Sequence, residues 1–167
     1  MIRTFEKEGV YSEALFSECE KYRYKLKRKW DNNLPQIMFI GLNPSTADEI
    51  KNDPTVSRMI NYAKQWGYGS VSVCNVFAFR ATFPKDLKNT KELVGRENDK
   101  SITEEAQSSE KIVIAWGNHA LFMNRNIEMM SLLHKHELFC IGVNKNGEPK
   151  HVLYLKKDLS PELFSET

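Results

Sequence analysis

Short, mostly apolar runs alternate with longer segments along this chain, and the alternation predicts the order of its elements. Four such runs, each bounded by turn-forming or polar residues, are typical of strands buried on both faces. They are residues 37–40, 70–76, 111–116 and 138–141. Three longer segments are predicted to be helices: residues 54–66, 99–108 and 120–134. Strands that alternate with helices favour right-handed parallel crossovers, so the pattern predicts an α/β protein, a three-layer α/β/α sandwich.

The first predicted helix has the clearest boundaries. Asp53 is a residue type that caps helices, and Pro54 at the first helical position loses no hydrogen bond there. Gly67 and Gly69 follow the last apolar position of the segment and are predicted to end the helix.

Residues 22–27 alternate strictly between apolar and basic side chains, which is the period of a strand. With the apolar run at residues 14–16 they predict an antiparallel hairpin. The two faces would carry Tyr22, Tyr24 and Leu26 on one side and Arg23, Lys25 and Lys27 on the other. Basic residues interleaved with aromatic ones can lie against a phosphate backbone. The alternative, which we favour, is the solvated, lysine-protected side of an edge strand.

The remaining segments complete the predicted layout. Residues 81–98 form a long polar connection, and a loop of this length without evident structure is often functional. After a turn at 144–149, residues 153–155 are expected to form a last strand, and Ser160 with Pro161 to begin a terminal helical turn. We expect a single domain over 1–167, with a lead-in and hairpin at 1–35, an α/β core at 36–155 and a tail at 156–167.

Composition narrows the class of protein. No apolar run is long enough to cross a membrane, and no secretory signal opens the chain. The three cysteines, Cys19, Cys74 and Cys140, are scattered, which favours a reducing cytoplasm and argues against a zinc or iron–sulfur site. We therefore expect a cytoplasmic protein without a metal or another cofactor. The formal charge of +2 permits nucleic-acid binding without indicating it, and the oligomeric state stays open.

The strand at 37–40 ends abruptly in a turn, and we place the candidate chemistry after it. Gly41 lets the backbone turn sharply, and Pro44 fixes the exit direction. In open parallel sheets, ligands bind outside the carboxyl ends of the strands. Candidate residues of this turn are Asn43, Ser45, Thr46 and Asp48. The alternative is an ordinary strand-to-helix turn in which Ser45 or Thr46 caps a helix.

Each predicted strand ends in similar polar side chains. The tips are Asn43, Asn75, Asn118 with His119, and the turn that carries His151. Asparagine donates and accepts at once and can read the edge of a nucleobase, on which Phe77 or Trp116 could stack. His151 could stabilise developing negative charge. Each residue also has an ordinary role as a strand-end, helix-start or core residue. The chain has no GxSxG nucleophile elbow and no phosphate-binding GxxxxGK[ST] loop.

Several stretches taken together are more specific than any one of them. These are GLNPSTADE, DPTV, WGYG, NVFAFRAT, GRENDK, AWGNHA and a closing G-x-P-x-H-x-LYL. The combination, from residue 16 to residue 155, resembles an uncharacterised bacterial and phage family catalogued only as a domain of unknown function (DUF1643). That resemblance implies no activity.

The same stretches also resemble, in order, the motifs of the uracil-DNA glycosylase superfamily. Residues 41–44 are similar to its first motif, and residues 74–81 to the strand whose asparagine reads the uracil edge. Residues 116–120 resemble a further strand end, and His151 falls where the superfamily has the histidine that stabilises the departing base. The resemblance implies a central, mainly parallel four-stranded sheet between helices, with the N-terminal β-hairpin added to it.

Departures from the superfamily pattern leave the activity open. Asn43 stands where the uracil-specific branch has a water-activating Asp, although the mismatch-specific branch also has Asn. His151 is followed by Val152 rather than Pro, and LYL replaces the segment that wedges into DNA, which puts duplex base flipping in doubt.

The resemblance implies an N-glycosidic hydrolase that acts on a base in DNA or in a nucleotide. Its catalytic residues would be Asn43, which places the water, and His151, which steadies the leaving base. Asp48 has no clear counterpart in the superfamily, but its position just after the turn makes it an alternative candidate for activating the water. Asn75 would read the base and Phe77 would stack on it. The other expected ligand-binding residues are Gly41, Leu42, Pro44, Ser45, Arg80, Trp116, Asn118 and His119. The alternatives are a non-catalytic module that binds a nucleobase or nucleic acid, and an enzyme that acts on a small nucleotide.

Overall fold

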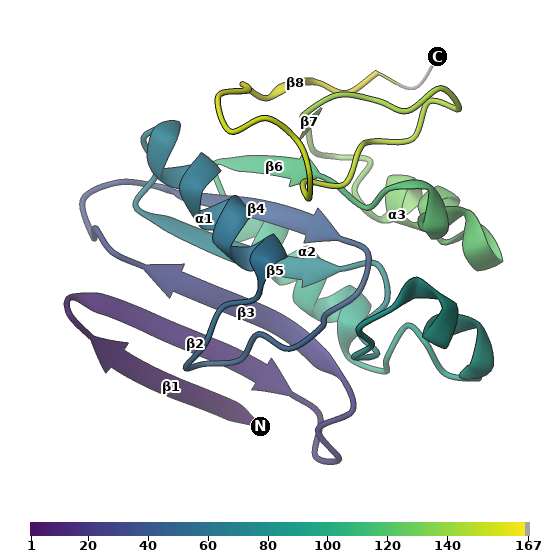
Figure 1. Cartoon of the computed structure of the whole chain (residues 1–167), viewed down its shortest axis with the longest axis horizontal. Helices are drawn as coiled ribbons and strands as arrows, with labels where there is room; N and C mark the ends of the chain where they lie inside the picture. Colours follow the sequence, from purple (N-terminus) through teal and green to yellow (C-terminus); the bar gives the residue numbers. More distant parts are fainter. Residues whose placement is uncertain (166–167) are drawn as a thin grey trace.

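The computed structural model describes residues 1–165, without the side chains of Pro84 and Asn89, and its centre is one mixed β-sheet (Figure 1). In the described residues the sheet has eight strands in the order β1-β2-β3-β5-β4-β6-β7-β8. The strands are β1 (Ile2–Lys7), β2 (Val10–Phe16), β3 (Arg23–Lys29), β4 (Gln36–Gly41), β5 (Ser70–Asn75), β6 (Lys111–Ile114), β7 (Leu138–Cys140) and β8 (Glu162–Leu163).

Most neighbouring strands in this sheet run antiparallel. The antiparallel pairs are β1–β2, β2–β3, β3–β5 and β7–β8, whereas β4–β5, β4–β6 and β6–β7 are parallel. The predicted three-layer α/β/α sandwich around a central, mainly parallel four-stranded sheet is therefore wrong. The N-terminal hairpin does not lie apart from the core, because β3 pairs with the edge of β5, and β8 extends the opposite edge.

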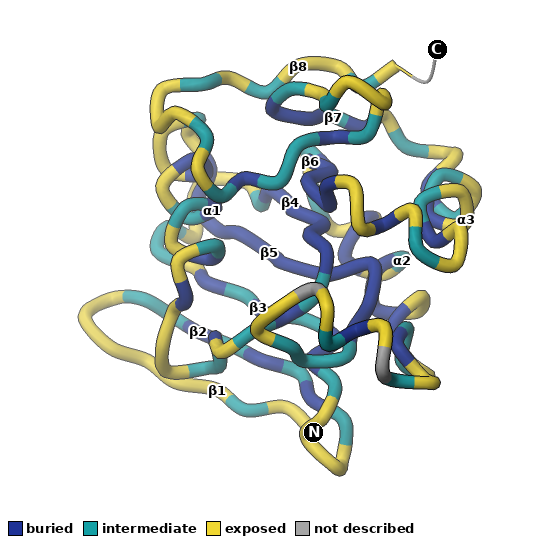
Figure 2. Tube along the Cα trace, turned by 45° about the vertical axis from the view of Figure 1, so that its right-hand side comes forward, coloured by how far each residue is buried: buried dark blue, intermediate teal, exposed yellow. Residues whose placement is uncertain are grey.

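Helices cover both faces of the sheet. They are α1 (Pro54–Gln65), α2 (Asn98–Ser108) and α3 (Arg125–Leu132), with short 3-10 segments η1 (Pro84–Asn89) and η2 (Asn118–Asn124). The side chains of α1 pack against Ile37, Phe39, Val71 and Val73 on one face. Those of α2 and α3 pack against Met38, Ile40, Ile112 and Ile114 on the other (Figure 1). The central strands are buried, while β1 lies largely exposed at the edge (Figure 2).

The predicted start of the first helix is confirmed. The carboxylate Oδ1 of Asp53 accepts a hydrogen bond of 2.9 Å from the N–H of Val56, and Pro54 occupies the first turn. The predicted helix over 120–134 is wrong at its start, because α3 begins only at Arg125. Met123 and Asn124 have φ of +59° and +56°, left-handed values that a continuous α-helix does not contain.

The hairpin β2–β3 forms, but its basic face differs from the prediction. The register shifts between Leu15 and Phe16, so the strict alternation does not carry through to Arg23. Arg23 is only 2% exposed, while Lys25 forms an ion pair of 2.8 Å with Glu13. Lys27 lies 3.4 Å from the carboxylate of Glu105 on α2. These cations satisfy carboxylates or backbone groups of the protein rather than forming a free outer row.

The C-terminal segment also departs from the expected elements. Residues 153–154 form a turn rather than a strand, and Tyr154 has φ of +71° and is 91% exposed. Glu162 and Leu163 pair with β7 where a helical turn was expected. In the part of the chain that the structure describes, no helix has both the length and the apolar character needed to cross a membrane.

Candidate functional site

A pocket of about 600 Å³ opens beyond the carboxyl ends of β4 and β6. The chain passes from β4 to β5 on one side of β4 and returns to β6 on its other side. Ligands of open α/β sheets bind at such a change of direction. The lining residues are Leu42, Asn43, Ser45, Thr55, Ala81, Thr82, Trp116, Gly117, Asn118, His119, Asn144, Lys150, His151, Leu153, Tyr154 and Leu155.

Backbone hydrogen bonds hold the turn after β4 against the segment after β5. The carbonyl oxygens of Gly41, Leu42 and Pro44 accept hydrogen bonds of 2.9–3.0 Å from the N–H groups of residues 76, 77 and 81. This ladder continues the parallel pairing of β4 with β5 past the ends of both strands. It fixes the direction in which the side chains of residues 42–45 leave the backbone.

Two protein carbonyl groups fix the orientation of the Asn43 amide. Its Nδ2 donates to the carbonyl oxygen of Ala81 at 2.7 Å and to that of Pro44 at 3.0 Å. Both N–H donors of the amide are therefore used within the protein. The Oδ1 atom makes no hydrogen bond within the described residues, so it can accept one from a ligand or from water.

His151 lies across the same pocket, and its ring has a defined tautomer when neutral. Its Nδ1 accepts a hydrogen bond of 3.1 Å from the N–H of Leu153, so the neutral ring must carry its proton on Nε2. Burial lowers the pKa of His151 below its ordinary value of 6.5, and the charge of Asp53 opposes this shift only in part. At neutral pH the side chain is therefore a neutral N–H donor.

The segment after β6 forms another part of the pocket wall. Trp116 is only 1% exposed, and its indole N–H donates at 2.9 Å to Oε2 of Glu148. Gly117 has φ of +70° and ψ of −173°, a region that is almost exclusive to glycine. Asn118 and His119 follow at the exposed rim, where Asn118 Oδ1 accepts a hydrogen bond of 3.0 Å from Asn144.

The structure thus brings seven of the predicted site residues to one pocket and places seven elsewhere. The seven are Leu42, Asn43, Ser45, Trp116, Asn118, His119 and His151. Gly41 and Pro44 act through the backbone, and a Cβ at Gly41 would lie 3.1 Å from Nδ2 of Asn75. The other five are Thr46, Asp48, Asn75, Phe77 and Arg80, which do not line this pocket.

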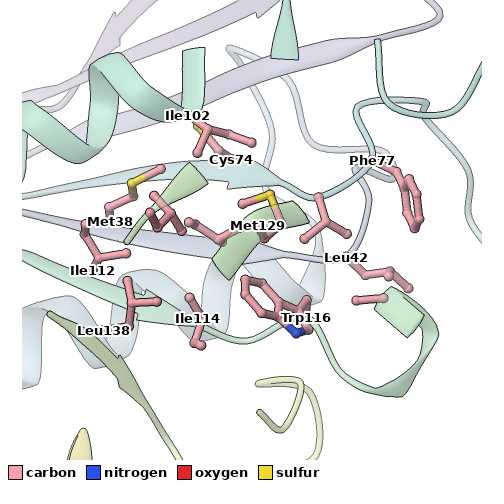
Figure 3. Close-up of a cluster of buried hydrophobic side chains, with 14 of the residues drawn as sticks. Met38, Leu42, Cys74, Phe77, Ile102, Ile112, Ile114, Trp116, Met129 and Leu138 are labelled. Atoms are coloured by element: carbon pink, nitrogen blue, oxygen red, sulfur yellow. The ribbon is translucent and has the colours of Figure 1, made fainter. Parts of the chain in front are cut away.

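Asn75 and Phe77 belong to the interior of the protein. The Oδ1 of Asn75 accepts a hydrogen bond of 3.2 Å from the buried guanidinium of Arg23, and its backbone oxygen accepts one from Asn98. Phe77 is fully buried in a cluster of apolar side chains (Figure 3). Its ring meets that of Phe122 edge to face. Neither side chain reaches the pocket, so their predicted roles in reading and stacking a base have no support in this geometry.

Asp48 and Arg80 serve local contacts. The carboxylate of Asp48 accepts hydrogen bonds of 2.9 Å from the N–H groups of Ile50 and Lys51. Burial alone would raise the pKa of Asp48, but these donors and nearby cations outweigh it and lower the pKa. Arg80 donates to the carbonyl of Glu20 and lies over the ring of Phe16. The predicted role of Asp48 in activating water stays a prediction.

Some pocket residues were missed by the sequence reasoning. They are Thr55, Ala81, Thr82, Gly117, Asn144, Lys150, Leu153, Tyr154 and Leu155. Lys150 adjoins His151 in sequence, and Thr82 lies near the start of the long connection at 81–98. Both therefore lie next to sequence features that had been predicted to be functional. Thr55 sits on α1, and only the packing of that helix against the sheet brings it to the pocket.

The described surface has other hollows. A larger one, of about 820 Å³, lies between the β2–β3 turn and α2, and it mixes acidic with basic side chains. None of the predicted site residues lines it. The pocket beyond β4 and β6 is therefore the better candidate for the chemistry that the sequence indicates.

The fold is that of an α/β protein, with a pocket at the change of strand direction. Residues 23–153 match the family described as "Protein of unknown function (DUF1643)", and the chain belongs to that family. No curated protein matches the chain. The resemblance to the uracil-DNA glycosylase superfamily is not tested by this match and stays a prediction.

Proposed function

We propose that this protein is an N-glycosidic hydrolase that binds a nucleobase, in DNA or in a nucleotide, and releases it. One observation carries the proposal: Asn43 and His151 line the same pocket, the first with a free acceptor and the second with its neutral N–H on Nε2. A pocket of about 600 Å³ is of the size that holds a small organic ligand.

The two side chains fit complementary steps of glycosidic hydrolysis. Asn43 Oδ1 would accept a hydrogen bond from the attacking water and hold it in place. As the bond between sugar carbon and base nitrogen breaks, its electron pair stays on the base, and the N–H of His151 would stabilise that charge. A bond forms between the sugar carbon and the water oxygen, and the water proton passes to solvent. An amide takes no proton at neutral pH, so leaving-group stabilisation must supply most of the acceleration.

The alternative is a non-catalytic module that binds a nucleobase. It is favoured by the chemistry of the lining, because no Asp or Glu of the described residues lines the pocket. Without a carboxylate there is no evident general base for the water. The alternative uses the same Asn43 acceptor and His151 donor to read a base edge, with no bond broken.

Base release tests the proposal directly. We would incubate the protein with oligonucleotides, single- and double-stranded, and with deoxynucleotides that carry uracil, hypoxanthine or hydroxymethyluracil. Released base is measured by chromatography, and oligonucleotides are also tested for alkali-sensitive sites. Asn43→Ala and His151→Ala are compared with the exposed control positions Asn32→Ala and His134→Ala.

We expect release that persists in both control variants and is lost in both pocket variants. Release that survives in His151→Ala at the wild-type rate would contradict the assigned role of the histidine. Binding of the same compounds without release, lost in the pocket variants alone, would establish the binding module instead.

A further inference from the structure

The pocket carries a positive charge without a negative one. Among the described lining residues Lys150 is a cation and His151 is a neutral donor, whereas Asp and Glu are absent. A site with this composition favours an anionic ligand. A neutral nucleobase does not need a cation to bind, so the positive charge indicates that the ligand has a second, anionic part.

Two carboxylates near the pocket are already occupied. Glu148 accepts hydrogen bonds from Trp116 Nε1 at 2.9 Å and from Asn126 at 2.7 Å. Asp53 accepts from the backbone N–H of Val56 at 2.9 Å. Neither forms an ion pair with Lys150 in the described residues. The positive charge of the pocket is therefore not neutralised from within.

Lys150 is held in a defined place. Its backbone N–H donates at 2.9 Å to the carbonyl of Gly142, and a Cβ on that glycine would lie 3.5 Å from Cδ of the lysine. The aliphatic stem thus lies along a residue that has no side chain, and the turn is closed by the bridge between Val143 and Pro149. Lys150 is half-buried and lies directly after this turn, immediately before His151.

We infer that Lys150 binds a phosphate of the ligand, and that the ligand is a free nucleoside monophosphate. This inference rests on the proposed function, since it adds a phosphate contact to a base held between Asn43 and His151. One lysine suits one phosphate. A nucleic-acid strand would need a row of free cations.

The basic residues that could have formed such a row are otherwise engaged. Arg23 and Arg28 are buried and donate to backbone and side-chain oxygens. Lys25 and Lys27 pair with Glu13 and Glu105. These four cations are therefore not free to follow a phosphate backbone, and the pocket cation stands apart from them.

Calorimetric titration tests the inference. The probes are deoxyuridine and deoxyinosine, their 5′-monophosphates, and twelve-nucleotide strands that contain the same bases. The proteins are the wild type, Lys150→Gln, and Lys145→Gln as a matched exposed control in the same turn. His151→Ala is added so that binding is measured without turnover.

We expect the wild type to bind one of the monophosphates about tenfold or more tightly than its nucleoside, as one charge-assisted contact allows. Lys150→Gln should remove that preference, and Lys145→Gln should keep it. Equal affinity for nucleoside and monophosphate, an unchanged preference in Lys150→Gln, or no binding of either probe at about 1 mM would overturn the inference.

Two further outcomes separate the possible sources and the two proposals. If a strand binds more tightly than the monophosphate and with steep salt dependence, the ligand is not a free nucleotide, and that part of the inference is overturned. The phosphate contact of Lys150 would then stand only if Lys150→Gln weakens binding of the strand. A phosphate preference without base release supports the inference and contradicts the hydrolase. Equal release from nucleoside and monophosphate supports the hydrolase and contradicts the inference.

Discussion

Asn43→Asp separates two explanations for the amide in the pocket. If Asn43 merely replaces a catalytic carboxylate, the substitution should raise the rate of base release. The geometry predicts the opposite, because Nδ2 of Asn43 donates to the carbonyl oxygens of Ala81 and Pro44 at 2.7 and 3.0 Å. A carboxylate would place an oxygen against these two carbonyl groups.

The expected cost follows from those two contacts. Each hydrogen bond contributes about 1 kcal/mol net, so their loss lowers the free energy of unfolding by about 2 kcal/mol, and repulsion between oxygens adds to it. For a chain of this length the thermal midpoint should fall by about 4–8 °C or more. Protonation restores one O–H donor, so the pKa of the introduced carboxyl is raised in the folded state above its unfolded value of about 3.9.

The stability deficit of Asn43→Asp should therefore be small near pH 4 and should grow as the pH rises through the raised pKa. Thermal and urea unfolding at pH 4.5 and 7.5 measure this, alongside base release. Asn43→Ala removes the bonds without adding charge, and Ser45→Asp adds a charge to the same pocket without breaking those bonds. A variant as stable as the wild type at pH 7.5, or one that releases base faster, would refute the reasoning.

Three further substitutions or conditions test separate parts of the structure. A Cβ at Gly69 would lie 2.1 Å from the backbone oxygen of Asp31, so Gly69→Ala should lower the free energy of unfolding, measured in urea, by about 3 kcal/mol. Gly67→Ala is the control, because a Cβ there would meet open space, and it should lower the free energy of unfolding by only about 1–2 kcal/mol. Gly117→Ala should cost about 1–3 kcal/mol by thermal unfolding through its backbone angles alone, since its Cβ would lie an ordinary 3.6 Å from His151. Burial lowers the pKa of His151 in the folded state, so stability should be complete above the unfolded value near 6.5 and should fall as the pH drops below it; an unchanged pH dependence of the midpoint in His151→Ala would contradict this.

Local signals in the sequence predicted local structure well. The helix start at Asp53 and Pro54 depends only on nearby residues, because the side chain of Asp53 bonds to the N–H of Val56, three residues later. It is found where it was predicted. The four apolar runs coincide with β4, β5, β6 and β7, because a strand buried on both faces is mostly apolar. Such signals report the conformation of a segment but not the identity of its neighbour.

Strand pairing and register depended on distant residues, and here the prediction failed. Nothing in the alternation of residues 22–27 specifies that β3 pairs with β5, which is what makes the sheet mostly antiparallel. The bulge between Leu15 and Phe16 likewise moves Arg23 from the expected outer face into the interior. A single break in register reverses the faces of all residues beyond it.

The candidate site was predicted only in part, because it too depends on contacts between residues that are distant in sequence. Strand-end reasoning placed Asn43 and the segment after β6 at one edge, and both line the pocket. It also placed Asn75 there, but β5 lies on the far side of β4 from β6, and Arg23 takes the Asn75 amide oxygen. That contact joins residues 52 positions apart, and no local pattern announces it.

The bounds of the family match can be compared with the position of the pocket. The matched residues, 23–153, begin at Arg23, whose buried guanidinium donates to the carbonyl oxygen of Ala47 in the turn that carries the pocket residues after β4. Burial lowers the pKa of Arg23 only to about 10, so it stays charged at neutral pH and can hold that turn. The match contains every pocket-lining residue except Tyr154 and Leu155, whereas β1, β2 and β8 lie outside it. The strands at the two edges of the sheet thus lie outside the matched residues, and the pocket lies almost entirely within them.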